Sequence, residues 1–437
     1  MKYDSITEVI GNTPLVRIDP RVHGLRTIDL YAKLEMMNPF GSVKDRAAWA
    51  MVRDHLDDAR REQRTVIELS SGNTAKALAV IAGMYQVRFR TVTNRMKVPE
   101  VKELLHLVGA EIEELPGQAE CLDPANVDDP LTRIHQQVAA DPSYLHTDQY
   151  YNQRNVQAHV DGTGPEIVRD LDGQAPDYFI ACVGTAGSSA GVARVLRSVR
   201  SDTTVVGLVA QKSDFVPGIR NIDEVHEVGL FDPQVYDQID AVSSQEAIDG
   251  TVELIRRCGI LAGPTGGAAY QGALRYLRSV DGAPSRRRTA VFVVCDRVEG
   301  YLSYIRARRP DLLGQAQVPG HVQVTAAELE QAVSLSPQSA SSWIRDQSAL
   351  VVDLRSGFGY TASRIAGSIN IPDELFADLL RGGLPFPVER PVLMACPVGD
   401  QSRRYVAVLN RLGHRAARSL EGGIVAWRDA GLPLERG

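Results

Sequence analysis

Short apolar runs rich in β-branched residues alternate with helix-like stretches from residue 28 to about residue 310. Four of these runs have the composition of buried strands: Thr65–Leu69, Tyr178–Val183, Thr204–Val209 and Ala290–Cys295. Three stretches between them have helical spacing: Ala47–Arg60, Thr74–Met84 and Ser188–Arg197. This alternation predicts an α/β fold with a largely parallel sheet covered on both faces, where ligands bind beyond the carboxyl ends of the strands.

The pattern changes near Pro310, and a chain of 437 residues is long enough for two or three domains. Residues 310–320 contain two prolines and two glycines among polar residues, as linkers do. A second, smaller α/β unit follows, with strands expected at Ala349–Leu354 and Val392–Ala395 and a helix at Ser402–Leu412. We therefore predict a domain at residues 1–310, a linker at 311–324 and a second domain at 325–437.

Several classes of function are disfavoured by charge and composition. The net charge of -6 gives no general attraction to nucleic acid or to an anionic membrane. The first residues lack the layout of a secretory signal, and no apolar run approaches about 18 residues, so we expect a cytoplasmic protein. The five cysteines include no C-x-x-C pair and the nine histidines form no ligand cluster, so we expect no metal.

Lys44 lies in the segment Asn38–Arg46, at the point where a turn becomes a helix. An arbitrary lysine in such a place is usually a solvated surface residue. Three further segments favour a functional interpretation: Ser70–Thr74, Gly184–Ser188 and Gly263–Ala269. Of these, Ser70–Thr74 follows a strand and suits a carboxylate, although an ordinary helix cap has the same composition. The glycine-rich loop Gly184–Ser188 suits a phosphate, although one such loop alone is weak evidence.

Taken in this order, the four segments resemble the fold-type II pyridoxal-phosphate (PLP) enzymes, specifically the cysteine synthase and cystathionine β-synthase group. Gly11–Leu15, Gly162–Glu166 and Asp296–Tyr301 resemble the same family. The resemblance covers about residues 1–310. It implies a two-lobed fold of mainly parallel sheets flanked by helices, pyridoxal 5'-phosphate as the cofactor, an amino-acid substrate and a homodimer.

The resemblance also implies a role for each segment. Lys44 would hold PLP as a Schiff base and would remove the α-proton of the substrate once it is released. Asn73 would bond to the 3-hydroxyl of the cofactor, and Thr265 would meet its pyridine nitrogen. Its phosphate would be held by N–H groups of Gly184, Thr185, Ala186, Gly187 and Ser188. The carboxylate of the substrate would be bound by Ser70, Ser71, Gly72 and Thr74.

Arg220 begins the segment Arg220–Glu224, which resembles the part of O-phosphoserine-dependent cysteine synthases where an arginine contacts the donor phosphate. A guanidinium group can form two parallel charge-assisted bonds to a phosphate. The alternative is a surface arginine paired with Asp223 or Glu224. We therefore expect O-phosphoserine as the donor, with O-acetylserine as the second choice.

Four positions depart from the family pattern. Ala75 and Lys76 stand where glycine and an apolar residue are usual, and Ala186 and Ser188 stand where glycine and threonine are common. These changes keep the cofactor plausible but leave the acceptor specificity open. We expect Lys76 to face solvent, and the alternative is a contact to an acidic group of the substrate.

Cys396 opens a second candidate site, in the loop Cys396–Gln401 between an expected strand and an expected helix. N–H groups directed into such a loop stabilise a thiolate or a persulfide, whereas a lone cysteine is more often a buried apolar residue. Four landmarks resemble rhodanese domains and cover about residues 325–437: Val351–Arg355, Ile365–Pro372, Leu420–Gly423 and Trp427. The six-residue loop fits a sulfurtransferase, and Ser402 stands where a related phosphatase would need arginine.

Two departures weaken the prediction that this second site is active. Gln401 stands where many active members have arginine, and Arg364 stands near a usual histidine. Because Cys396 itself is present, we expect sulfur transfer, with a binding or structural role as the alternative.

Together these features predict a PLP-dependent β-replacement on an O-activated L-serine with a sulfur nucleophile, which yields cysteine or an S-substituted derivative. Cys396 would relay the sulfur, with a sulfur-carrier protein as a further partner. The alternatives are β-replacement with an amine nucleophile, a cysteine desulfhydrase and a non-catalytic regulatory binding protein.

Overall fold

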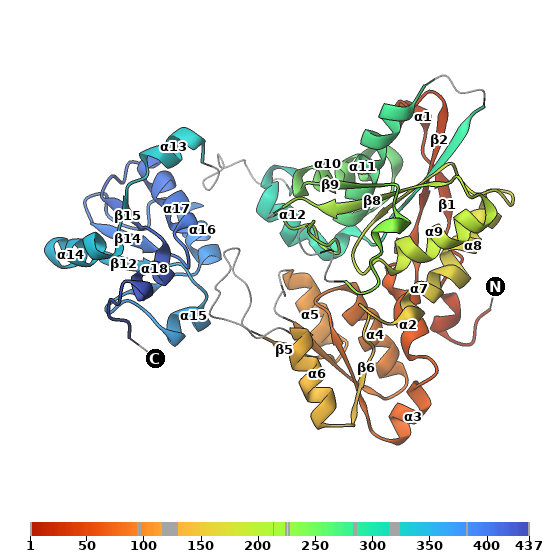
Figure 1. Ribbon diagram of the computed structural model, residues 1–437, viewed down its shortest axis with the longest axis horizontal. Helices are drawn as coiled ribbons and strands as arrows, with labels where there is room; N and C mark the ends of the chain where they lie inside the picture. The colour runs from red at the N-terminus through yellow and green to blue at the C-terminus, as the bar shows by residue number, and fades with distance from the viewer. Residues whose placement is uncertain are drawn as a thin grey trace. The chain divides into compact units, whose positions relative to one another are not determined.

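The computed structural model describes residues 2–93, 96, 98–115, 130–212, 214–222, 225, 228–282, 286–313, 324–381 and 383–435. The chain divides into two compact units, with the change between them at Leu312–Leu313 (Figure 1). The 3-10 helix η7 (Pro310–Leu313) occupies the start of the predicted linker, and residues 314–323 lie outside the described residues. Both units are α/β, as the alternating pattern predicts.

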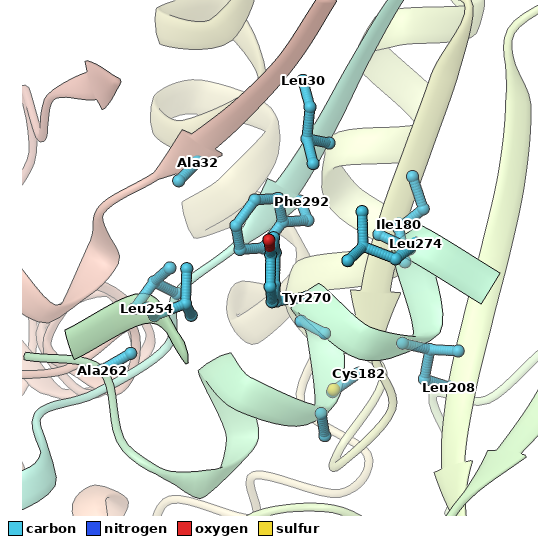
Figure 2. Close-up of a cluster of buried hydrophobic side chains, with 14 of the residues drawn as sticks. Leu30, Ala32, Ile180, Cys182, Leu208, Leu254, Ala262, Tyr270, Leu274 and Phe292 are labelled. Atoms are coloured by element: carbon cyan, nitrogen blue, oxygen red, sulfur yellow. The ribbon is translucent and has the colours of Figure 1, made fainter. Parts of the chain in front are cut away.

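A six-stranded sheet forms the larger part of the first unit, in the order β1-β2-β10-β7-β8-β9. Only β1 and β2 pair antiparallel, and the other neighbours are parallel. The strands are β1 (Leu15–Arg17), β2 (Ile28–Lys33), β7 (Tyr178–Cys182), β8 (Thr204–Ala210), β9 (Gln238–Val242) and β10 (Arg288–Val293). Figure 2 shows the apolar side chains packed against this sheet, where the rings of Tyr270 and Phe292 lie 5.7 Å apart.

A second, four-stranded sheet in the same unit has the order β5-β4-β3-β6, and all its strands are parallel. Its strands are β3 (Thr65–Leu69), β4 (Arg88–Thr93), β5 (Glu111–Glu114) and β6 (Tyr144–His146). The first unit therefore contains two mainly parallel sheets flanked by helices, which is the two-lobed arrangement that the resemblance implies.

The helices of the first unit connect and cover these strands. They are α1 (Pro20–His23), α2 (Lys44–Val52), α3 (Leu56–Arg61), α4 (Asn73–Met84), α5 (Pro99–Leu107), α6 (Pro130–Ala140), α7 (Gln153–Ala158), α8 (Gly164–Asp170), α9 (Gly187–Val199), α10 (Ser244–Cys258), α11 (Pro264–Val280) and α12 (Leu302–Arg308). Short turns of other helix types are η1 (Ile6–Val9), η2 (Glu35–Met37), η3 (His159–Thr163), η5 (Pro233–Val235) and η6 (Val298–Tyr301). The predicted stretch Ala47–Arg60 is divided between α2 and α3, because a turn after Val52 brings Leu56 and Ala59 into the core.

The second unit is built on a five-stranded parallel sheet in the order β11-β15-β14-β12-β13. Its strands are β11 (Ser334–Leu335), β12 (Leu350–Asp353), β13 (Ile369–Asn370), β14 (Val392–Ala395) and β15 (Ala417–Leu420). Its helices are α13 (Ala326–Gln331), α14 (Pro337–Gln347), α15 (Gly357–Ala362), α16 (Asp373–Arg381), α17 (Asp400–Arg411) and α18 (Gly423–Asp429). The described part of the chain contains no helix that is long and apolar enough to cross a membrane.

Candidate functional site

Lys44 is the first residue of α2 and lies beside the chain that leaves the carboxyl end of β10. Val43 donates its N–H to the carbonyl of Cys295 at 2.8 Å, and Ser42 forms a β-bridge with Asp296. The Lys44 N–H is capped by the Ser42 hydroxyl at 3.2 Å. The lysine is therefore held at the edge of the sheet where ligands of α/β folds bind.

The amine of Lys44 is prepared for covalent chemistry by its surroundings. Desolvation lowers the pKa of the Lys44 amine, against the opposing effects of Cys295 and Asp296. Among the described residues, none forms a hydrogen bond or an ion pair with this amine. A partly buried, unpaired amine of lowered pKa is the kind of group that attacks an aldehyde.

The segment Ser70–Thr74 connects β3 to α4, and its hydroxyl groups are mostly engaged within the protein. The Ser70 hydroxyl accepts the N–H groups of Gly72 and Ala75, and the Thr74 hydroxyl donates to Gln149 at 2.8 Å. By contrast, the N–H groups of Ser71, Asn73 and Thr74 have no acceptor in the described chain. Unpaired N–H groups at the start of a 12-residue helix suit a carboxylate. The predicted carboxylate role of Ser70, Ser71, Gly72 and Thr74 stays a prediction, and the Gly72 N–H is already bonded to Ser70.

The loop Gly184–Ser188 connects β7 to α9 and has the shape of an anion cradle. A Cβ on Gly184 would lie 2.6 Å from the Gly218 carbonyl oxygen, and one on Gly187 would overlap the Asn155 side chain, so both positions require glycine. Within the described residues, the N–H groups of Gly184, Thr185 and Ala186 have no acceptor. Ala186 adopts φ 63°, the left-handed conformation, which explains why glycine is common at this position. The donor set fits the cofactor phosphate.

Thr265 and Asn73 lie near these loops, but their polar groups have protein partners. The Thr265 hydroxyl donates to the Pro217 carbonyl at 2.6 Å, so it would have to turn to donate to a pyridine nitrogen. The amide nitrogen of Asn73 donates to Asp296 at 2.7 Å and to Tyr301 at 3.0 Å. Its oxygen is left to accept the proton of a 3-hydroxyl. Both predicted roles stay predictions.

Arg220 lies next to the phosphate cradle. Its N–H donates to the carbonyl of Val183, the residue before Gly184, and its guanidinium carbon lies 5.0 Å from the centre of the Tyr150 ring. Tyr150 follows Gln149, which binds Thr74 of the carboxylate segment. The backbone of Arg220 thus adjoins the phosphate cradle, and its side chain lies on a ring that follows the partner of Thr74. The alternative partners Asp223 and Glu224 lie outside the described residues.

The expectation that Lys76 faces solvent is wrong. Its amine lies 3.7 Å from the position that a Cβ on Gly41 would occupy. Desolvation lowers the pKa of this amine, and the charges of Asp45, Asp296 and Glu299 only partly oppose the effect. Lys76 is three residues beyond Asn73 on α4 and so lies on the same face of that helix. Because Asn73 faces the segment Asp296–Tyr301, Lys76 is turned into the protein as well.

A buried ion network, which the sequence did not reveal, supports α2 two residues beyond Lys44. Arg46 pairs with Glu35 at 2.6 Å and with Glu166 at 2.7 Å, and Lys33 pairs with Glu166 at 2.9 Å. Glu166 also accepts the N–H groups of Asn12 and Thr13. The motifs Gly11–Leu15 and Gly162–Glu166 therefore support the helix that begins at Lys44, and Gly11 and Gly162 leave space for the Arg46 guanidinium.

Glu68 gives the first unit an expected pH dependence. It is fully buried at the end of β3, and burial raises its pKa to about 7 although Thr147, Gln149 and Leu69 donate to it. Its reference pKa is 4.5, so the unfolded chain loses the proton first as pH rises. The contribution of Glu68 to stability is therefore present below pH 4.5 and is lost between pH 4.5 and about 7.

We expect the free energy of unfolding to decrease less between pH 4.5 and about 7 in Glu68→Gln than in the wild type. Urea unfolding of the wild type and the variant at intervals across this range measures the effect, and the exposed Glu62→Gln is the matched control. Equal slopes for the wild type and Glu68→Gln would contradict the assignment.

In the second unit, Cys396 lies between β14 and α17 with its sulfur directed into the loop. The sulfur accepts the N–H groups of Gly399 at 3.1 Å and of Ser402 at 3.4 Å, and the Ser402 hydroxyl lies 3.5 Å away. The Ser402 hydroxyl also lies 2.8 Å from the Ser419 hydroxyl. The sequence alone gave neither serine a role at the thiol. Donors aimed at one sulfur favour a thiolate or a persulfide anion.

The rhodanese-like landmarks surround this loop. A Cβ on Gly423 would overlap the Cys396 carbonyl, which explains the paired glycines, and Ile424 donates its N–H to that carbonyl at 3.0 Å. Gln401 is 7% exposed, and Cys396 has no exposed surface. Arg364 lies over the Tyr360 ring and pairs with Glu435. No group of three or more potential metal ligands occurs in the described ranges.

Comparisons with known proteins show the family to which each unit belongs. Residues 6–296 match the family model "Pyridoxal-phosphate dependent enzyme", and residues 336–430 match "Rhodanese-like domain". Cysteine synthase B of Salmonella typhimurium is 33% identical over 306 residues, which is 69% of this chain and 95% of that protein. Cysteine synthase of Staphylococcus aureus is 31% identical over 69% of this chain and 96% of its own length.

Solved structures show the same similarity. Cysteine synthase from Entamoeba histolytica superposes with a TM-score of 0.61 at 25% identity and covers 70% of this chain and 90% of its own. A hydrogen sulfide-producing enzyme from Fusobacterium nucleatum gives 0.60 at 26% identity, covering 69% of this chain and 99% of its own.

Proposed function

We propose that this chain, which belongs to the pyridoxal-phosphate dependent enzyme family and to its cysteine synthase group, makes cysteine or an S-substituted derivative from O-phosphoserine. The second unit is a rhodanese-like domain. The observation that supports the choice of donor is that Arg220 is joined to the residue before the phosphate cradle and contacts the Tyr150 ring, next to the partner of Thr74. A cation near these loops would stabilise an ester phosphate by charge-assisted hydrogen bonds.

The cofactor, the carboxylate segment and Lys44 each have a separate role in the proposed reaction. Pyridoxal 5'-phosphate, when bound, withdraws electrons from the α-carbon, so that the α-proton becomes acidic and the β-substituent can leave. Ser71, Asn73 and Thr74 orient the substrate through its carboxylate. The Lys44 amine takes the α-proton and later returns it. The C–O bond at the β-carbon breaks, phosphate leaves with the electron pair, and a C–S bond forms to the incoming sulfur, so that dianionic O-phosphoserine and H₂S give cysteine and HPO₄²⁻.

The donor is tested by visible spectra of the purified enzyme, titrated separately with O-phosphoserine, O-acetylserine and cysteine. We expect O-phosphoserine to shift the cofactor band at the lowest concentration. Arg220→Ala should raise the half-saturating O-phosphoserine concentration about tenfold or more, the scale of a lost charge-assisted bond, and leave O-acetylserine unchanged. The exposed Arg194→Ala is the matched control. Equal losses for both donors, or a wild-type preference for O-acetylserine, would contradict the proposal.

We also propose that Cys396 supplies the sulfur. The thiolate would take the outer sulfur of thiosulfate and release sulfite, and two thiols would then convert the persulfide to the free thiol and hydrogen sulfide with formation of one disulfide. Attachment to one chain raises the local concentration of that sulfide without a channel. Assembly as a homodimer stays a prediction from the resemblance, and a cytoplasmic location stays a prediction from the composition of the chain.

Cys396→Ser tests this relay. It should abolish cysteine formation from thiosulfate plus a small thiol and leave cysteine formation from added sulfide unchanged. Full activity of the variant with thiosulfate would show that the domain does not supply sulfur.

A further inference from the structure

Lys76 brings a second amine into the wall of the first site. Its amine lies over Gly41, which is three residues before Lys44 and has φ 88°. Its helical neighbour Asn73 contacts Asp296 and Tyr301 at the same wall. The Lys76 side chain therefore reaches the space between the loop that carries Lys44 and the segment that follows β10.

This amine has three hydrogen-bond donors and no partner within the described ranges. Two of the acids around it have other partners: Asp45 accepts the Phe40 N–H at 2.6 Å and the Ser42 hydroxyl at 3.1 Å, and Glu299 pairs with Arg297 at 2.5 Å. One oxygen of Asp296 accepts the Asn73 amide and the Tyr301 hydroxyl, and its other oxygen is buried without a hydrogen-bond partner among the described residues. A desolvated ammonium group without a partner is unfavourable, so the site is unsatisfied as it stands.

The other candidate anion sites are already matched to ligands. The unpaired N–H groups of Ser71–Thr74 suit the carboxylate of the donor, the loop Gly184–Ser188 suits the cofactor phosphate, and Arg220 suits the ester phosphate. The incoming nucleophile is the one reactant without a binding group.

We propose that Lys76 forms a subsite for a negative charge on the incoming nucleophile, so that the acceptor class it favours is a small thiol that carries a sulfonate or carboxylate. This inference rests on the proposed β-replacement. A charge-assisted bond to the amine in a partly desolvated wall would orient such a thiol toward the β-carbon. Desolvation lowers the pKa of the Lys76 amine, and an anion bound beside it would add to the opposing effect of Asp45, Asp296 and Glu299, which favour the protonated form.

A matched pair of acceptors tests the subsite in the holoenzyme. 2-Mercaptoethanesulfonate and 2-mercaptoethanol differ in charge but share the reacting thiol, and the ratio of their kcat/KM values is compared between variants. Lys76→Met should lower the sulfonate ratio, which is kcat/KM for 2-mercaptoethanesulfonate divided by kcat/KM for 2-mercaptoethanol, about tenfold or more. Lys76→Arg should restore most of this ratio. Lys102→Met, which removes an exposed cation on α5, is the control and should leave the ratio unchanged.

Occupancy of the subsite is measured without turnover. Reductive methylation followed by mass spectrometry reports how accessible the Lys76 amine is, and ethanesulfonate, which has no thiol, should slow methylation of Lys76 but not of Lys102. A sulfonate ratio that is unchanged in Lys76→Met, or equal methylation with and without ethanesulfonate, would overturn the inference. Loss of stability in Lys76→Met with no change in the ratio would likewise overturn it and leave Lys76 as a structural charge.

Failure of the proposed function has a different signature. If the wild type joins neither thiol nor sulfide to O-phosphoserine or O-acetylserine, the β-replacement itself is wrong. If sulfide reacts but the sulfonate ratio is the same in the wild type and in Lys76→Met, the proposed β-replacement is supported and the proposed subsite is wrong.

Discussion

Lys44→Ala is expected to lower the rate of β-replacement by about 10³-fold or more and to remove the covalent attachment of the cofactor. The variant loses the group that attacks the aldehyde and the base that takes the α-proton, and general-base catalysis alone contributes about 10²–10⁴-fold. Borohydride reduction followed by peptide mass spectrometry measures the attachment, and product analysis with O-phosphoserine and sulfide measures the rate. In the wild type the cofactor mass should lie on the peptide that contains Lys44.

Lys76→Met is the informative control for this experiment, because it removes the other partly buried amine of the same wall. It should keep the reducible linkage at Lys44. Attachment of the cofactor to Lys76 in the wild type, or normal turnover of Lys44→Ala, would refute the assignment of Lys44. Neither result would be explained by a loss of folding.

Glu166→Ala is expected to destabilise the first unit by about 3–5 kcal/mol, the cost of removing one partner from a buried ion pair. Glu166 pairs with Arg46 and Lys33, and these cations are 5% and 0% exposed, so neither can turn to water when the carboxylate is removed. The N–H groups of Asn12 and Thr13 also lose their acceptor. Urea unfolding followed by hydrogen exchange of α2 peptides reports on this unit alone.

Asp161→Ala is the matched control, since Asp161 is a nearby carboxylate that bonds only to the side chain of Gln157 among its described neighbours. Its effect should stay within about 0.5 kcal/mol, as for other surface substitutions. A loss of less than about 1 kcal/mol in Glu166→Ala would mean that the network does not hold α2.

The fold follows from the sequence where local pattern and burial agree. The predicted strand Thr65–Leu69 is β3 without change, and Val392–Ala395 is β14 without change, because every residue of these runs except Leu69 is buried. The loops after β3, β7 and β14 could also be predicted from the sequence, because glycine and small hydroxyl residues at a strand-to-helix turn are typical of anion-binding loops.

The remaining parts of the site depend on contacts between distant segments. Arg46 and Glu166 stand 120 residues apart, so their pairing cannot be read from either motif. Lys76 illustrates the same limit: its polarity alone predicts a solvent-facing side chain, and only the packing of α4 against the segment after β10 turns it inward. The partners of the Thr265 and Asn73 side chains are also set by other loops.

The complete burial of Cys396 bears on the lifetime of the sulfur it would carry. A persulfide is destroyed by stray thiols and by oxidants, and a sulfur atom with no exposed surface is shielded from both. If Cys396 carries sulfur, we therefore expect exchange with small thiols to be limited by opening of the loop between β14 and α17, so that alkylation of Cys396 in the native protein should be slower than in the unfolded chain. The store would then release sulfur at a rate governed by backbone motion more than by the reactivity of its thiol.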